Sequence, residues 1–116
     1  MKTAAKFSLV LVTAPDLKNA QSLAHLALDA RLVACANLIP QTESHYWWQG
    51  KIETSRETLI LFKTLKAHLP ALEKLVRKNH PYEVPEFLVL PLSQGSPAYL
   101  QWLADAVTPA ISPNKE

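Results

Sequence analysis

The sequence predicts a single α+β domain with the ferredoxin-like order βαββαβ and an additional helix near its C-terminal end. Apolar runs of strand length alternate in that order with segments that carry an apolar stripe at helical spacing. The length of 116 residues allows one domain, and 48% hydrophobic residues suffice for one modest core. We therefore expect one domain over 1–116, ordered from about 7 to 107, with an antiparallel sheet and both main helices on one of its faces.

The first strand and helix are predicted from an apolar run and a capping residue. The run 7–12 is apolar and β-branched, as in a central strand buried on both faces. Asp16 is a typical helix N-cap and precedes a helix over 17–30. The apolar residues of that helix form one stripe, made of Leu17, Ala20, Leu23, Ala24, Ala27 and Leu28.

The middle of the chain predicts one long β-hairpin. Its arms are 33–48, with a bulge or edge position at Pro40, and 51–63, and Gln49-Gly50 is the turn. An extended arm of this length reaches about 50 Å, whereas the first helix covers only about 21 Å. The outer half, with Tyr46, Trp47 and Trp48, therefore needs another chain to cover it, which predicts an obligate oligomer.

The second half predicts two helices and a strand. A helix over 67–79 has Pro70 in its first turn, and a strand follows at 86–92. Ser96-Pro97 is an N-cap followed by proline at the first helical position, so a last helix begins there and ends at Pro109. We expect 111–116 to be a frayed tail.

Composition excludes several classes of function. A net charge of +2 and the lack of an RNA-binding RNP1 pattern argue against nucleic acid, and no apolar run is long enough to span a membrane. Two glycines cannot form a glycine-rich phosphate loop, and no catalytic spacing is evident, so we expect no enzyme. The single cysteine, Cys35, and an apolar core at 9–12 too short for a signal peptide predict a cytoplasmic protein.

Several blocks in order resemble the CutA divalent-cation-tolerance proteins over about residues 7 to 107. The blocks are 13–16, 33–40, 46–53, 61–64, 80–86 and 99–102. The resemblance implies a ferredoxin-like subunit in a homotrimer like that of the PII signalling proteins. It also implies a part in divalent metal ion tolerance, with weak binding of copper(II) or another divalent cation that folding does not require.

The family's proposed copper ligands fall on Val12, Asn79 and His80, and only His80 retains a ligand side chain. We therefore predict metal binding at His80 with Glu86, and with Cys35 as a soft candidate. Two structural alternatives stand beside this prediction. His80 caps the second helix and hydrogen-bonds across a subunit interface, or Cys35 is a small buried hydrophobe.

A second set of residues suggests a different ligand. By resemblance to related trimers, Lys63, Glu57, Tyr82 and Trp48 converge on an inter-subunit cleft that binds a small anion in a PII-like signalling or scaffold protein. The alternative is that Lys63 is a solvated strand end or an interface ion pair. The remaining histidines, at 25, 45 and 68, have no partners at ligand spacing, and we expect them to be surface or interface residues.

Overall fold

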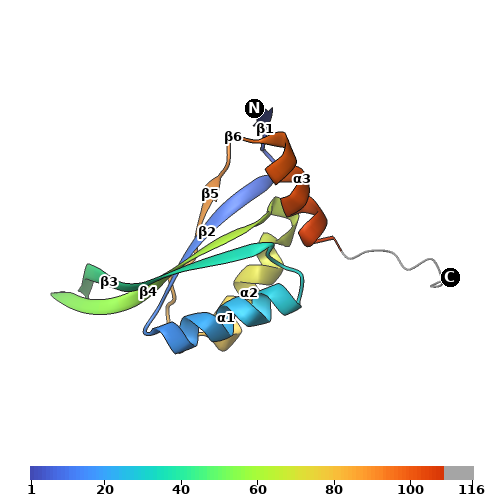
Figure 1. The fold of residues 1–116 in the computed structure, drawn as a ribbon. Coiled ribbons are helices and arrows are strands. Elements are labelled where there is room, and N and C mark those ends of the chain that lie inside the picture. Colours follow the sequence, from blue (N-terminus) through green and yellow to red (C-terminus); the bar gives the residue numbers. More distant parts are fainter. Residues whose placement is uncertain (109–116) are drawn as a thin grey trace.

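A four-stranded antiparallel sheet organises residues 1–108, the part of the chain that the computed structural model describes (Figure 1). Its strands are β2 (Phe7–Ala14), β3 (Cys35–Trp48), β4 (Lys51–Leu65) and β5 (Leu88–Pro91). Their spatial order is β3-β4-β2-β5, with one helix between β2 and β3 and another between β4 and β5. This is the predicted ferredoxin-like topology.

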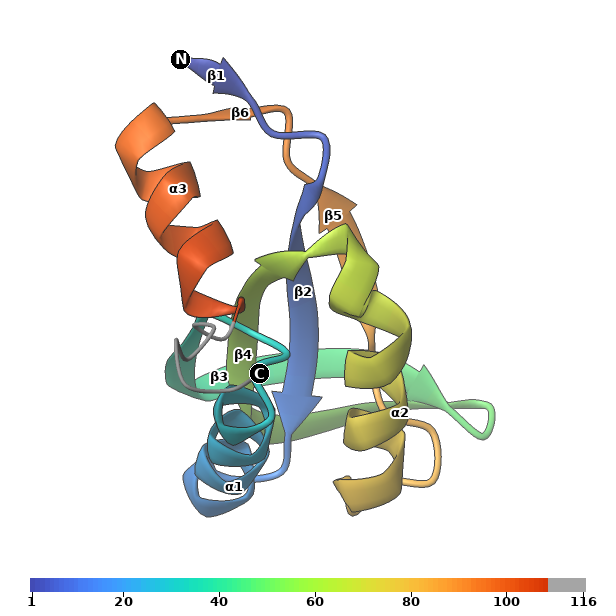
Figure 2. The same ribbon diagram turned by 90° about the vertical axis from the view of Figure 1, so that its right-hand side faces the viewer.

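Two helices cover one face of this sheet, as predicted (Figure 2). Helix α1 (Leu17–Asp29) begins after Asp16, whose side chain accepts a hydrogen bond from the Asn19 backbone N–H at 2.8 Å. Helix α2 (Leu69–Asn79) is preceded by a 3₁₀ turn, η1 (Lys66–His68), and tolerates Pro70 in its first turn, where a backbone N–H would have no partner within the helix. The shared core contains Val10, Val12, Ala20, Leu23, Ala27, Ile60, Phe62, Leu72 and Val76.

The predicted stripe of α1 is narrower than expected. Ala20, Leu23, Ala24 and Ala27 are buried, but Leu17 and Leu28 are 41% and 37% exposed. The small side chains at the centre of the stripe let the helix lie close to the sheet, so residues at the margins of the stripe are left in solvent.

The opposite face of the sheet is apolar and largely uncovered within the described chain. Directly paired residues of antiparallel strands share a face, and Leu9 lies opposite Leu90 while Leu11 lies between Leu61 and Leu88. We call this surface the open face, and it consists of Leu9, Leu11, Leu59, Leu61, Leu88 and Leu90. Helix α3 (Pro97–Ala106) covers only one end of it, where Leu100 and Leu103 pack against Phe7.

The hairpin of β3 and β4 projects beyond the helices and gives the molecule its long axis (Figure 1), with extents of 55 × 33 × 22 Å. The predicted turn is present, with φ of 50° at Gln49 and 79° at Gly50. The predicted bulge is also present, as a register shift between Ile39 and Thr42. At the tip, Tyr46, Trp47 and Trp48 are 41%, 72% and 48% exposed.

Several strands and helices differ in their bounds from those predicted from the sequence. Strand β5 pairs only with Ser8 to Leu11, so it is shorter than the predicted 86–92. Helix α3 starts after Ser96 as predicted but ends at Ala106, three residues before Pro109. A two-stranded sheet of β1 (Lys2–Thr3) and β6 (Gln94–Gly95) was not predicted. The predicted tail at 111–116 lies outside the described residues. Within residues 1–108, no helix is both long and apolar enough to cross a bilayer.

Candidate functional site

A groove of about 860 Å³ lies between the hairpin and the loop 81–86, which leads from α2 to β5. Ser44, Tyr46 and Trp48 line it from alternate positions of β3, and Ser55 and Glu57 line it from alternate positions of β4. Alternate residues of a strand point to the same face, so one face of the hairpin forms one wall of the groove. The loop forms the other wall, and prolines at 81 and 85 restrict its backbone.

His80 anchors the loop to the central strand. Its Nε2 lies 2.7 Å from the Thr13 carbonyl oxygen, and its Nδ1 accepts a hydrogen bond from the Tyr82 backbone N–H at 3.0 Å. Because Nδ1 accepts, Nε2 carries the hydrogen and donates it to Thr13. The ring is buried, with 8% exposed, and lies 4.8 Å from the ring of Tyr82.

Both nitrogens of His80 are therefore engaged within its own chain. The residue is also the C-cap of α2, which is part of the structural alternative considered from the sequence, although its partners are not across an interface. Binding of a metal ion through this imidazole stays a prediction, and it requires that one of the two hydrogen bonds be given up.

Tyr82 and Glu57 join the loop to the hairpin. The Tyr82 hydroxyl donates a 2.8 Å hydrogen bond to Oε2 of Glu57, which is 7% exposed. Burial of the phenol raises the pKa of Tyr82 well above its usual value, and the hydrogen bond to the Glu57 carboxylate raises that pKa further. Tyr82 is therefore a neutral hydrogen-bond donor at ordinary pH.

Glu86 adds a second carboxyl group near Glu57. Partial burial raises the pKa of Glu86 above its ordinary value, and repulsion from the charge of Glu57 raises it further. Glu83 lines the same groove, and none of the described lining residues is a lysine or an arginine. The groove is thus an acidic site in which a cation would relieve repulsion between carboxylates.

The structure brings together three of the four predicted cleft residues. Glu57, Tyr82 and Trp48 line the groove, but Lys63 does not. Lys63 lies opposite Leu9, four residues along β2 from Thr13, and its Nζ is 3.5 Å from the Tyr99 hydroxyl. Convergence of all four residues stays a prediction that would need a second chain.

The predicted metal ligands are not gathered within one chain. Cys35 lies opposite Lys63, away from the groove, and its Sγ is 3.5 Å from Oδ1 of Asn37. Among residues 1–108, no group of three or more histidine, cysteine, aspartate or glutamate side chains is arranged to hold a metal ion. Of the predicted ligands, Glu86 alone lines the groove.

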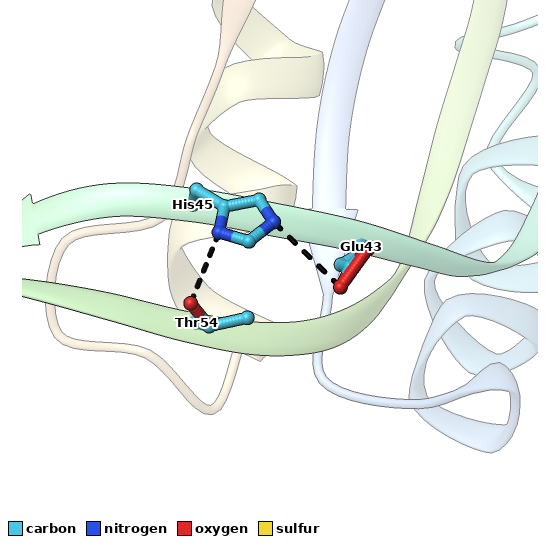
Figure 3. A network of polar contacts seen from close by, with 3 residues as sticks. All are labelled: Glu43, His45 and Thr54. Carbon is cyan, nitrogen blue, oxygen red and sulfur yellow. Dashed lines mark hydrogen bonds and ion pairs between the residues drawn. The ribbon is translucent and has the colours of Figure 1, made fainter.

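One of the remaining histidines, His45, has polar partners on the hairpin. Nδ1 of His45 lies 3.0 Å from Oγ1 of Thr54, and its Nε2 lies 3.7 Å from a carboxylate oxygen of Glu43 (Figure 3). These contacts are not a set of metal ligands, so they do not contradict the prediction that His45 lacks partners at ligand spacing, and its side chain is 59% exposed, as expected of a surface residue. The signal for the contacts was available, because Glu43 is two residues away on the same strand face and the turn at Gln49-Gly50 sets Thr54 opposite His45.

Comparison with known proteins identifies what the chain resembles. The model of the family described as "CutA1 divalent ion tolerance protein" matches residues 8–106. The chain is 47% identical over 105 residues to mouse Protein CutA, an alignment that covers 90% of this chain and 59% of the mouse protein. It therefore spans less than two thirds of that relative's length.

Two further matches extend over most of both proteins. The divalent-cation tolerance protein CutA of Escherichia coli is 46% identical over 95 residues, covering 82% of this chain and 85% of that protein. A solved structure described as the periplasmic divalent cation tolerance protein CutA of Archaeoglobus fulgidus superposes with a TM-score of 0.84 at 31% identity. That match covers 87% of this chain and 98% of the archaeal one.

Proposed function

Because the chain belongs to the CutA1 divalent ion tolerance protein family, we propose that it binds a divalent cation weakly in the groove between the hairpin and the loop 81–86. One observation carries the proposal. The groove is lined by the carboxyl groups of Glu57, Glu83 and Glu86, with no lysine or arginine among its described lining residues, although these three groups do not form a ready-made set of metal ligands in one described chain. Burial raises the pKa of Glu86, the charge of Glu57 raises it further, and a divalent cation there would offset that second contribution.

Copper(II) is the cation we favour, as a ligand and not as part of the fold. Carboxylate oxygens from Glu86 and Glu57 provide hard donors, and an imidazole would add the nitrogen that suits copper(II) or zinc(II). His80 does not itself line the groove and supplies that nitrogen only by giving up one hydrogen bond, and Cys35 lies too far along the sheet to join within one chain. Such an incomplete ligand set supports weak binding.

No observation in the groove favours the anionic ligand. The cation that would have attracted it, Lys63, lies beside Tyr99 instead. The bacterial and archaeal relatives are described by their tolerance of divalent cations and not by a reaction, which supports a binding protein over an enzyme.

The proposal includes a homotrimer. Its support is the open face, whose leucines no described helix covers, together with the exposed aromatic tip of the hairpin. Exposed contiguous apolar surface of this kind marks an association site.

The location of the protein in the cell is a separate part of the proposal. The single cysteine supports a cytoplasmic location, whereas the solved archaeal relative is described as periplasmic. Fractionation of the native cells decides between the two locations.

Isothermal titration with copper(II) and zinc(II) at neutral pH tests the cation proposal. We expect saturable, weak binding that falls at least about tenfold in Glu86→Gln, since a carboxylate ligand is lost. The matched control is Glu73→Gln, which removes the same charge from the surface of α2. Equal binding by Glu86→Gln and the parent protein would place the cation outside the groove and overturn the proposal.

A further inference from the structure

Helix α3 packs apart from the core that α1 and α2 cover. Its buried leucines, Leu100 and Leu103, form a cluster with Ala4 and Phe7, and this cluster shares no buried residue with that core. Parts of a protein that are joined to the core by few contacts open at a lower free energy than the whole protein unfolds. The contacts at the ends of α3 therefore matter for how firmly it is attached.

The C-terminal end of α3 is satisfied partly from outside the helix. Thr108 bonds the carbonyl of Ala104 with its hydroxyl and the carbonyl of Asp105 with its backbone N–H. The next carbonyl, that of Ala106, accepts a 2.8 Å hydrogen bond from the guanidinium of Arg31, which follows α1 (Figure 1). A cation is favourable at this end of a helix, and α3 has no basic residue in its own last turn. Arg31 supplies the missing charge from a distant part of the chain.

The backbone of Arg31 has a conformation that favours glycine. Its φ is 59°, in the left-handed region where a residue with a Cβ is strained. It follows the C-cap of α1, and the N–H groups of Arg31 and Leu32 donate to the carbonyls of Leu28 and Ala27 at 3.0 Å. Glycine is the usual residue at this position of such a helix end. The contact of the guanidinium with α3 gives the arginine a role that glycine cannot fill.

We propose that α3 detaches from the sheet and docks again as a unit while the core stays folded, and that Arg31 is the positioning residue that holds it docked. With α3 docked, Phe7 is only 3% exposed. Detachment uncovers this ring at the start of β2, at one end of the open face. The inference uses contacts within one chain, and it depends neither on the cation site nor on the trimer.

Native-state amide hydrogen exchange of the full chain tests this proposal. The amides of Leu103 and Ala104 report on α3, and those of Val10 and Val12 report on the core. We expect the α3 amides of the parent protein to exchange at least about tenfold faster than the core amides, since detachment costs less than unfolding. Arg31→Ala should accelerate exchange in α3 by about three- to tenfold, because the charged hydrogen bond to the end of the helix is lost.

Arg31→Gly separates the side chain from the backbone. Relative to Arg31→Ala, it should slow exchange in the core about three- to fivefold, because it removes the left-handed strain from the folded protein. It should leave the α3 rates at those of Arg31→Ala, because the end of α1 stays folded when α3 detaches. Arg31→Lys, which keeps a cation, should give α3 rates between those of the parent protein and Arg31→Ala. The control is Arg77→Ala, which removes an exposed arginine from α2 and should leave both rates near those of the parent protein.

Three results would overturn the inference. Equal exchange rates in α3 and the core of the parent protein would show that α3 does not detach on its own, as expected if other copies of the chain hold it in place. Slower exchange in α3 as well as in the core of Arg31→Gly, relative to Arg31→Ala, would show that α3 opens only when the whole protein unfolds. Parental α3 rates in Arg31→Ala would show that Arg31 does not hold the helix.

Discussion

At the scale of single residues, the loop that forms one wall of the groove depends on a histidine. His80 is buried and satisfies a carbonyl at Thr13 and an N–H at Tyr82, which belong to segments far apart in the sequence. A buried backbone group without a partner costs about 1–3 kcal/mol. The ring therefore stabilises the end of the loop whether or not it ever meets a metal ion.

His80→Ala should lower the free energy of unfolding by about 1–3 kcal/mol, because it leaves the Thr13 carbonyl and the Tyr82 N–H unpartnered. The control is the adjacent Asn79→Ala, which removes an exposed side chain that bonds only the Leu75 carbonyl of its own helix. Urea unfolding of both variants without metal measures the difference. An equal loss in the two variants would show that the His80 hydrogen bonds contribute nothing beyond an exposed contact.

The raised pKa of Glu86 predicts how the stability of the protein depends on pH. Burial and the charge of Glu57 raise the pKa of Glu86 in the folded protein above its ordinary value of 4.5. The folded state therefore holds the proton more strongly, and ionisation of this group removes stability as the pH rises from 4.5 through the raised pKa. Glu86→Gln should raise the melting temperature at pH 7 and leave it unchanged near pH 4. Thermal melts at both values measure this, and a lower melting temperature at pH 7 would contradict it.

At the scale of elements, different physical constraints favour glycine at Gly50 and at Gly95. Gly50 has φ of 79° in the hairpin turn, and a Cβ added to it meets nothing within 4 Å. A Cβ on Gly95, in β6, would lie 2.9 Å from the Leu100 side chain, and Leu100 is only 3% exposed. The first position is restricted by backbone conformation and the second by packing.

Gly50→Ala should therefore lower the free energy of unfolding by about 1 kcal/mol, because a residue with a Cβ is strained in the left-handed region. Gly95→Ala should cost about 1–3 kcal/mol, because a buried leucine must move. The two explanations are distinguished by measuring the free energy of unfolding, by chemical denaturation, of each glycine variant alone and in combination with Leu100→Ala. That second change should relieve the cost of Gly95→Ala and leave the cost of Gly50→Ala unaltered, and additive effects at Gly95 would contradict the packing explanation.

Much of this fold could be predicted from local patterns. The cap at Ser96 and the turn at Gln49-Gly50 each have a signal within a few residues, and each was confirmed. Strands β1 and β6 have two residues each, which is too short for any period to show. Next to them, Ala4 and Phe7 share a buried cluster with Leu100 and Leu103 of α3, a contact between distant parts of the chain that local patterns do not give.

The candidate site was predictable only in part, for a similar reason. Glu57, Tyr82 and Trp48 were predicted together and do line one groove, but the resemblance that grouped them also included Lys63. The position of Lys63 follows from the register of β4 against β2, which local patterns do not give. Nor could the sequence show that both nitrogens of His80 find backbone partners within the chain.

At the scale of the whole molecule, two apolar surfaces lack cover in the described chain. The open face lies on the side of the sheet away from α1 and α2, and the tip of the hairpin extends along the 55 Å axis beyond both helices. Burying one leucine side chain contributes about 1.5–3 kcal/mol. Covering these surfaces with further copies of the chain therefore gives the proposed trimer a large driving force.

Leu61→Lys should disrupt the assembly, because it places a charge in the middle of the open face, opposite Leu11. The matched control is Leu26→Lys, which puts the same charge on the outer surface of α1, where Leu26 is 40% exposed. Light scattering after gel filtration should give three times the subunit mass of 12.9 kDa for the parent protein and for Leu26→Lys. Leu61→Lys should give smaller species or an unfolded chain, which circular dichroism distinguishes. A folded parent protein at the mass of one subunit, or an intact trimer in Leu61→Lys, would show that the open face is not where the chains meet.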